Sequence, residues 1–153
     1  MRIELSQIPA EGMTLKGESP PSVLDLEGDR FIRCKEPVTH EFFVQLLPEE
    51  LVVRGRLEAE LELACVRCAE FFSTTVTDSS FLRAYDIAEA VEVIDLSEDI
   101  RDTVLLGIPQ FPVCKSDCRG LCPQCGKNLN DGPCDCPPLR EEGRWDALDR
   151  LNL

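Results

Sequence analysis

The sequence is poor in the residues that most enzymes need. Its 153 residues contain a single histidine, His40, and no glycine-rich phosphate loop of the P-loop or dinucleotide-binding kind. Hydrolytic chemistry needs a nucleophile paired with a base, and no such pair is visible. The carboxylates sit on faces that we expect to be solvated. The sequence therefore predicts a protein that is not an enzyme, with no catalytic residues and no small-molecule substrate.

Long apolar runs are also absent. No stretch approaches the roughly 18 consecutive apolar residues that span a bilayer, and residues 1–17 lack the apolar core of a secretory signal. We therefore expect a cytoplasmic protein that makes no membrane contact. In that compartment the nine cysteines would more often bind metal or perform redox chemistry than form a disulfide framework.

Basic residues are scarce. The chain has 16 Lys and Arg against 29 Asp and Glu, a net charge of −13. Residues 1–113 hold 22 acids and 10 bases, and residues 86–102 alone hold seven acids. An acidic surface repels phosphate backbones, which argues against a general nucleic-acid binder. It favours a basic partner such as a ribosomal protein, although the acids could equally serve only to keep the protein in solution.

Strand patterns fill the first half of the chain. Residues 53–65 alternate between apolar and charged side chains, as in a long antiparallel strand with one wet face. Residues 71–82 are β-branched and aromatic and read as the returning strand. The intervening "CVRC" is then a hairpin tip that carries two thiols. Further strands are expected within residues 31–48, interrupted at Pro37, within residues 1–8 at an edge, and within residues 91–96.

One helix is expected near residues 97–107, with Ser97 at its N-cap and Gly107 and Pro109 at its end. Its apolar stripe would consist of Ile100, Val104 and Leu105. The fold class is therefore α+β: an antiparallel β-rich body, sheet or barrel-like, with one packed helix and a C-terminal zinc-ribbon-like module. The expected domains are a body over residues 1–113, a cysteine-rich zinc module over 114–138, and a short C-terminal helix or tail over 139–153.

Six of the nine cysteines lie in residues 114–136, a segment with too few apolar residues to build its own core. A bound metal is the usual substitute. Zinc takes four thiolates at roughly 2.3 Å, and two thiols separated by two to four residues can chelate one ion. Such pairs are Cys65/Cys68, Cys114/Cys118 and Cys122/Cys125, and a tighter pair is Cys134/Cys136. "CPQCG" is the strongest local zinc-ribbon signal.

Two divisions of these eight cysteines are possible. The first places Cys122, Cys125, Cys134 and Cys136 in one closed site and leaves Cys65, Cys68, Cys114 and Cys118 to share a second ion. The alternative joins the four cysteines of residues 114–125 and pairs Cys134 and Cys136 with the hairpin. We favour the first. Two zinc ions, each held by four thiolates, would change the formal charge from −13 to about −17. Iron–sulfur clusters are a less favoured reading, and Cys34 reads as a small buried hydrophobe.

These motifs resemble those of the YceD family. The resemblance is carried by the hairpin "LACVRCAEFF" and by "LGIPQFPVCKSDCRGLCPQCGKNLN", followed by "CDC". It covers roughly residues 31–136 and is weakest at the N-terminus. It implies a cytosolic protein needed for accumulation of 23S ribosomal RNA, with no known enzymatic activity. It also implies two separable sites, because some relatives keep the hairpin pair and lack the second half of the C-terminal cluster.

The function expected from these observations is a ribosome-biogenesis factor for the large subunit. Its partner would be a basic large-subunit ribosomal protein or a pre-large-subunit particle. Lys115, Arg119 and Lys127 could add an auxiliary contact with ribosomal RNA, although three bases are too few for strong nonspecific binding. The alternative is a zinc- or redox-responsive cysteine module. A thioredoxin-like role for "CVRC" is weaker, because that motif lies between strands and not at a helix N-terminus.

Overall fold

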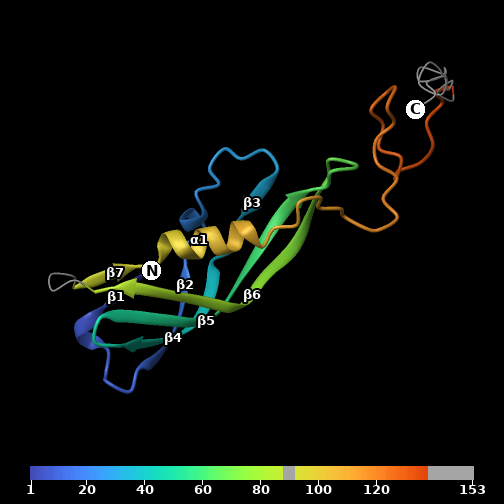
Figure 1. Ribbon diagram of the computed structural model, residues 1–153. Coiled ribbons are helices and arrows are strands. Elements are labelled where there is room, and N and C mark those ends of the chain that lie inside the picture. The colour runs from blue at the N-terminus through green and yellow to red at the C-terminus, as the bar shows by residue number, and fades with distance from the viewer. Residues whose placement is uncertain (88–91, 138–153) are drawn as a thin grey trace, which may run out of the picture.

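The computed structural model describes residues 1–87 and 92–137. Its main body is a curled antiparallel sheet with a helix against one face, and the cysteine-rich segment extends beyond one end of the sheet (Figure 1). This arrangement confirms the α+β class expected from the sequence. Within the described residues no helix is long and apolar enough to cross a membrane. The expected C-terminal helix or tail over residues 139–153 lies outside the described residues.

The five-stranded sheet is organised around one long strand. Its members are β2 (Met13–Ser19), β3 (Ile32–Cys34), β4 (Val38–Leu46), β5 (Glu50–Ala64) and β6 (Phe71–Asp86). One edge of β5 pairs first with β4 and then with β3, and the other edge pairs with β6 over almost its whole length. Pro37 separates β3 from β4, as expected, because proline cannot donate to the ladder.

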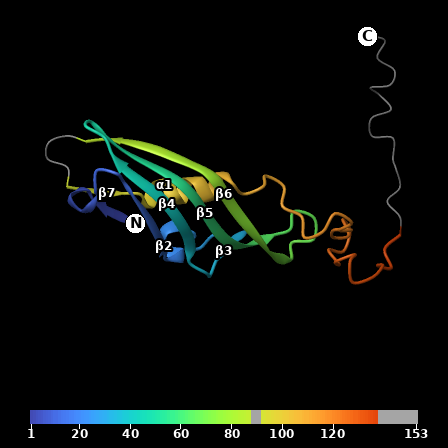
Figure 2. The same cartoon turned by 90° about the horizontal axis from the view of Figure 1, so that it is seen from below.

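The alternation of apolar and charged side chains in residues 53–65 determines which face of β5 forms the core. Every odd position of β5 from Leu51 to Leu63 apart from Gly55 is buried. The helix α1 (Ser97–Leu106) and the short η2 turn (Pro21–Leu24) cover this face (Figure 2). Ile100, Val104 and Leu24 are fully buried there. At about 25 cal/mol per Å² of apolar area removed from water, this packing is the main stabilising contribution to the body.

Gly55 lets two strands approach closely at the bend of the sheet. A Cβ at this position would lie 2.1 Å from the carbonyl oxygen of Glu41 on β4. On the other side of β5 the register with β6 shifts by one residue, and Asp78 stabilises the bulge by accepting hydrogen bonds from Ser80 N–H at 2.6 Å and from its hydroxyl at 2.8 Å. Bulges of this kind bend a sheet and increase its twist, in keeping with the curl seen in Figure 2.

The chain's first strand does not join the main sheet. β1 (Arg2–Glu4), followed by the η1 turn (Leu5–Gln7), pairs antiparallel with β7 (Val93–Asp95) as a separate two-stranded ribbon. The expectation that Ser97 caps α1 is wrong: Leu96 is the N-cap residue, and Ser97 is the first helical residue. The hydroxyl and N–H of Ser97 instead donate to Asp95. These bonds, with help from Arg2, hold the pKa of the Asp95 carboxyl well below its usual range.

Two further details differ from the expectation. No sequence pattern predicts β2, which forms the outer edge of the sheet beside β4. Leu105 of the expected apolar stripe is only half-buried, whereas Thr103 is buried on the helix face that meets β6. Gly107 ends α1 as expected, and a Cβ there would lie 2.6 Å from Val76 Cγ1 of β6.

Candidate metal centres

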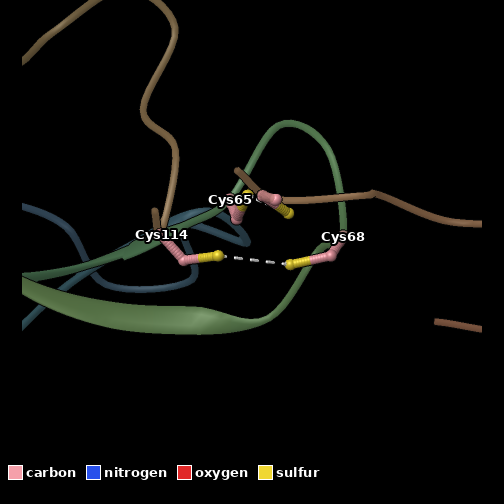
Figure 3. A group of neighbouring side chains, drawn as sticks. Cys65, Cys68 and Cys114 are labelled. Carbon is pink, nitrogen blue, oxygen red and sulfur yellow. Dashed lines mark hydrogen bonds between the residues drawn. The ribbon is translucent and has the colours of Figure 1, made fainter. Parts of the chain in front are cut away.

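The first group of cysteines joins the hairpin tip to the segment after α1. Cys65 directly follows β5, Cys68 lies in the turn before β6, and Cys114 comes from the later segment (Figure 3). Cys118 of the same segment completes the group. The four Sγ atoms all lie within 4.8 Å of one another, and we call them the first tetrad. Cys65, Cys68 and Cys118 are buried and form a small cluster with neighbouring apolar side chains, including Phe72 and Val113.

The sulfur spacing fits a single tetrahedral ion. Cys65 and Cys118 have Sγ atoms 3.8 Å apart, and those of Cys68 and Cys114 are 3.7 Å apart. A tetrahedron with metal–sulfur bonds of roughly 2.3 Å has edges of about 3.8 Å. A disulfide would need about 2.05 Å between sulfurs, and all nine cysteines are free. The tetrad therefore has the dimensions of a closed four-thiolate metal site.

The hairpin tip adopts a tight cysteine turn. The N–H of Arg67 points at the Cys65 sulfur at 3.4 Å, and the N–H of Ala69 donates to the Cys65 carbonyl at 2.8 Å. Ala69 takes a left-handed conformation with φ of 60°, which non-glycine residues rarely adopt. This turn directs backbone N–H groups toward a sulfur, where they stabilise thiolate charge.

Arg67 fastens the hairpin to the cysteine-rich segment without using a metal. Its guanidinium donates to the carbonyls of Ser116 at 3.3 Å and Cys118 at 3.1 Å. Its own carbonyl accepts the N–H of Leu121 at 3.0 Å. Gly120 lies against the same backbone, and a Cβ there would come within 2.9 Å of the Arg67 carbonyl oxygen. The first tetrad thus sits inside a hydrogen-bonded junction.

The second group consists of Cys122, Cys125, Cys134 and Cys136, whose Sγ atoms also lie within 4.8 Å of one another. We call this the second tetrad. Cys122 is buried, Cys125 is exposed, and the other two are half-buried. Gln124 N–H points at the Cys122 sulfur at 3.4 Å, and Gly126 N–H donates to the Cys122 carbonyl at 2.9 Å. Lys127 donates to the Pro133 carbonyl at 2.7 Å and closes the loop.

The turn that follows Cys122 and Cys125 connects the two tetrads. The side-chain amide nitrogen of Asn130 donates to the Cys118 sulfur of the first tetrad at 3.3 Å. Its oxygen accepts the N–H of Arg119 at 2.9 Å. Asn128 holds Asn130 in place, because its side-chain oxygen accepts both the N–H and the amide of Asn130.

The protonation of the thiols differs within each tetrad. Burial raises the pKa of the Cys65 thiol, but backbone N–H groups such as that of Arg67 outweigh it and lower the pKa to about 6. Burial and the neighbouring sulfurs raise the pKa of Cys114 to about 12. In the second tetrad the backbone N–H groups of the turn lower the pKa of the Cys122 thiol to about 6. The pKa of the Cys136 thiol is raised to about 12 by its hydrogen bond with Cys125 and by burial. Four adjacent thiolates need a cation to ionise together.

All eight cysteines expected at metal sites are brought together in two groups, and the grouping is the first of the two divisions considered from the sequence. Cys34 lies on β3 and belongs to neither group. It is only half-buried, with its sulfur 3.2 Å from the Glu36 carbonyl oxygen, and burial raises its pKa. The expectation of a buried hydrophobe therefore holds in part.

Arg67 and Asn130 were not recognised from the sequence. Arg67 lies between two cysteines and looks like a solvated base. Two asparagines spaced two apart in "NLN" are a signal for side-chain-to-backbone turns, and this signal could have indicated a fixed loop. It could not have indicated which sulfur the loop reaches.

Comparison with known proteins agrees with the motif resemblance. Residues 83–152 match the family model "Large ribosomal RNA subunit accumulation protein YceD". The chloroplastic "Large ribosomal RNA subunit accumulation protein YCED homolog 1" of Arabidopsis thaliana is 50% identical over 61 residues, which cover 40% of this chain and 19% of that protein. The homologue of that name in Zea mays is 45% identical over 51 residues, covering 33% of this chain and 17% of the maize protein.

A bacterial relative matches over a longer stretch. An uncharacterized protein of Mycobacterium tuberculosis is 34% identical over 105 residues, covering 59% of this chain and 50% of the mycobacterial protein. The matched region thus spans at most half the length of these relatives. No solved structure gives a significant match. Residues 83–152 of this chain are therefore similar to the YceD family, and relatives that carry the family name match part of the chain as well.

Proposed function

We propose that the chain is a non-enzymatic factor for the accumulation of large-subunit ribosomal RNA, and that two zinc ions stabilise its C-terminal part. The observation that carries the proposal is the match of residues 83–152 to the YceD family model, whose description names this role. The plant relatives carry the same description. We also propose the division expected from the sequence: a body over residues 1–113, a zinc module over 114–138 and a tail over 139–153.

Zinc is the metal that suits both tetrads best. Four thiolates in a tetrahedral arrangement are the ligand set of structural zinc, and such a site has no open position for a substrate. The sulfur atoms of each tetrad lie within 4.8 Å of one another. This compactness supports a single ion over an iron–sulfur cluster, in which several irons and sulfides separate the cysteines. Reduced thiols also require a reducing compartment such as the cytoplasm.

Charge is distributed unevenly along the molecule. Asp86, Glu92, Glu98 and Asp102 are exposed, and none of them forms a salt bridge within residues 1–87 and 92–137. They lie at the end of β6, beside β7 and along α1, toward the end of the body away from the cysteines (Figure 1). We call these four residues the acidic end. It suits a basic large-subunit protein or a pre-large-subunit particle.

The cysteine-rich segment holds basic residues as well as acidic ones. Lys115, Arg119 and Lys127 are exposed there, although neighbouring acids keep the local balance near neutral. An auxiliary contact with ribosomal RNA at this end would position the particle, while the acidic end contacts protein. Few phosphate contacts imply a shallow salt dependence.

The first experiment is metal analysis of the purified full chain together with an absorption spectrum. Two zinc ions per chain and no visible band are expected. A coloured protein containing iron and sulfide, or a chain that binds fewer than two ions, would contradict the zinc assignment.

The alternative of a zinc- or redox-responsive module rests on the exposure of Cys125. Release of one ion by mild oxidant while the chain's large-subunit function is unaffected would favour that alternative.

The second experiment tests the biological role. Cells that lack the gene are expected to show a deficit of large subunits and accumulated precursors of large-subunit RNA on sucrose gradients. The wild-type gene should restore both. Normal levels of both subunits and of RNA precursors in the deleted cells would exclude the role.

The third experiment locates the partner surface. Affinity purification compares the wild type with a variant in which the four residues of the acidic end are changed to their amides. A basic large-subunit protein is expected to be lost from the variant. Amide variants of Glu58 and Glu60, which are exposed on β5, serve as a matched control, because they change charge at a different place. Equal recovery from all three proteins would mean that the acidic end is not the contact.

A further inference from the structure

The bond from Asn130 to Cys118 crosses from one candidate metal centre to the other. Asn130 lies in the turn that follows Cys122 and Cys125, whereas Cys118 belongs to the first tetrad. Both hydrogens of the Asn130 amide are used, one on the Cys118 sulfur at 3.3 Å and one on Asn128 at 2.8 Å. Its oxygen accepts the Arg119 N–H at 2.9 Å. The network fixes the amide orientation, because a flip would place the oxygen against the sulfur.

The position of Asn130 depends on the loop that the second tetrad closes. Cys122 N–H donates to the Lys127 carbonyl at 2.8 Å, and Leu129 N–H donates to the Gly120 carbonyl at 2.9 Å. These bonds and the bridge between Leu121 and Asn128 form a small hairpin. Its turn begins at the cysteine pair 122/125. A hairpin this short has too little apolar area to be stable alone, so an ion in the second tetrad is what can hold it.

An amide donor changes the binding of metal by a thiolate. A sulfur that ligates a metal keeps part of its negative charge, and an N–H directed at it stabilises that charge. Removal of such supporting hydrogen bonds typically weakens metal binding by about 10- to 100-fold. The Asn130 amide is a side-chain donor, unlike the backbone N–H groups of the two cysteine turns, and its contribution therefore depends on the loop being in place.

We propose that Asn130 is a positioning residue that couples the two metal centres. An ion in the second tetrad orders the turn that carries Asn130, and the amide then stabilises the Cys118 thiolate in the first tetrad. The two ions therefore bind cooperatively. The ion in the second tetrad strengthens metal binding at the first tetrad, which joins the cysteine-rich segment to the sheet. This inference rests on the proposed binding of zinc at both tetrads. By linkage, each ion tightens the binding of the other by the same factor.

Zinc titrations of the full chain in competition with a chromogenic chelator test the coupling. A Cys134→Ser/Cys136→Ser variant retains only the first centre, and a Cys65→Ser/Cys68→Ser variant retains only the second. Each remaining site is expected to bind zinc about 10- to 100-fold more weakly than the same site in the wild type, by equal factors. Two ions bound with affinities that do not depend on each other would overturn the coupling while leaving the zinc assignment intact. A wild type that binds no zinc would instead contradict the assignment.

Asn130 variants test the route of the coupling. Asn130→Ala should weaken the first site by the same factor as loss of the second centre, and should have little further effect when Cys134 and Cys136 are already serine. Asn130→Asp keeps an oxygen for the Arg119 N–H but puts a carboxylate against the sulfur, so it should weaken the first site more than alanine does. An equal cost of Asn130→Ala in both backgrounds would overturn the role of Asn130.

A control variant separates this effect from general damage to the loop. Ser116 lies two residues from Cys118, and its hydroxyl makes no hydrogen bond among the described residues. Ser116→Ala should leave both zinc affinities unchanged. Far-ultraviolet circular dichroism of every variant should retain the β signal of the body, because the body's core is separate from the tetrads. A Ser116→Ala effect as large as that of Asn130→Ala would also overturn the inference.

Discussion

Ala69 and Gly126 occupy the same position in two equivalent cysteine turns. Each follows the second cysteine of its pair, each donates its N–H to the carbonyl of the first cysteine, at 2.8 Å and 2.9 Å, and each has a left-handed backbone with φ of 60° and 73°. The chain therefore uses one local geometry twice, once at a hairpin tip and once in a ribbon. Only the second turn has the glycine that this geometry favours.

Gly126→Ala and Ala69→Gly should have unequal effects on zinc binding. A Cβ at Gly126 would meet nothing within 4 Å, so Gly126→Ala should cost only the left-handed backbone penalty of about 1 kcal/mol. That cost should appear as a roughly fivefold weaker second zinc site in chelator competition. Ala69→Gly relieves the same strain while it loosens the unfolded chain, so the first site should not weaken. If the two substitutions weakened zinc binding equally, the left-handed backbone conformation would not be the cause of the weaker binding.

The body could be predicted from the sequence where residue pattern and burial coincide. β5 alternates strictly, and its odd positions meet α1 and η2, so the pattern directly reports the buried face. Pro37 breaks the pairing in the middle of an otherwise continuous stretch. The spacing of the cysteines also predicts which sulfur atoms lie close together, because thiols two to four residues apart can reach the same point whatever the fold.

Other features depend on tertiary contacts that no local pattern encodes. β2 was not expected because its later inward positions are Gly17 and Ser19 and not large apolar residues. The His40 ring fills the space over Gly17, where a Cβ would lie 2.9 Å from His40 Cε1. Asn130 reaches a sulfur 12 residues away, and only the folded loop brings the two together.

Gly55→Ala should strongly destabilise the body. A Cβ at this position would lie 2.1 Å from the Glu41 carbonyl oxygen and 2.9 Å from Phe42 Cα, and backbone atoms of a central strand cannot move aside easily. We expect the free energy of unfolding, measured by urea titration, to fall by about 3 kcal/mol or more, the upper end of the range for overpacked cores. Gly28→Ala is the control: it has open space and φ of 85°, so it should cost about 1 kcal/mol. Similar losses for the two variants would contradict the role of the close strand approach.

His40 should make stability depend on pH between neutral and mildly acidic conditions. The ring is buried, its Nε2 lies 3.3 Å from the Ser19 hydroxyl, and its Nδ1 has no partner among the described residues. Burial, and then the positive N-terminus, lower its pKa, opposed by Glu18. The unfolded state therefore binds a proton more readily, so the contribution to stability is complete above about pH 6.5 and is lost as pH falls below it.

Urea unfolding at pH 7.5 and pH 5.5 checks this prediction. The wild type should lose more stability between these values than His40→Gln, which has no titratable ring. Because both proteins carry the same thiols, the difference between them removes the contribution of metal loss at low pH. Identical pH dependences for the two proteins would contradict a buried neutral His40.

Serine substitutions in the two tetrads should loosen different lengths of chain. Cys68 and Cys114 join positions 46 residues apart, so Cys68→Ser should open the junction and expose residues 112–137 to protease. Cys134→Ser should expose only residues 122–137, because the first tetrad retains its four thiolates and the Arg67 bonds. Even a 100-fold weaker first site remains loaded, since structural zinc sites typically contribute about 10–16 kcal/mol. Limited proteolysis followed by mass spectrometry distinguishes the two patterns, and identical fragments from both variants would mean that the tetrads act as one unit.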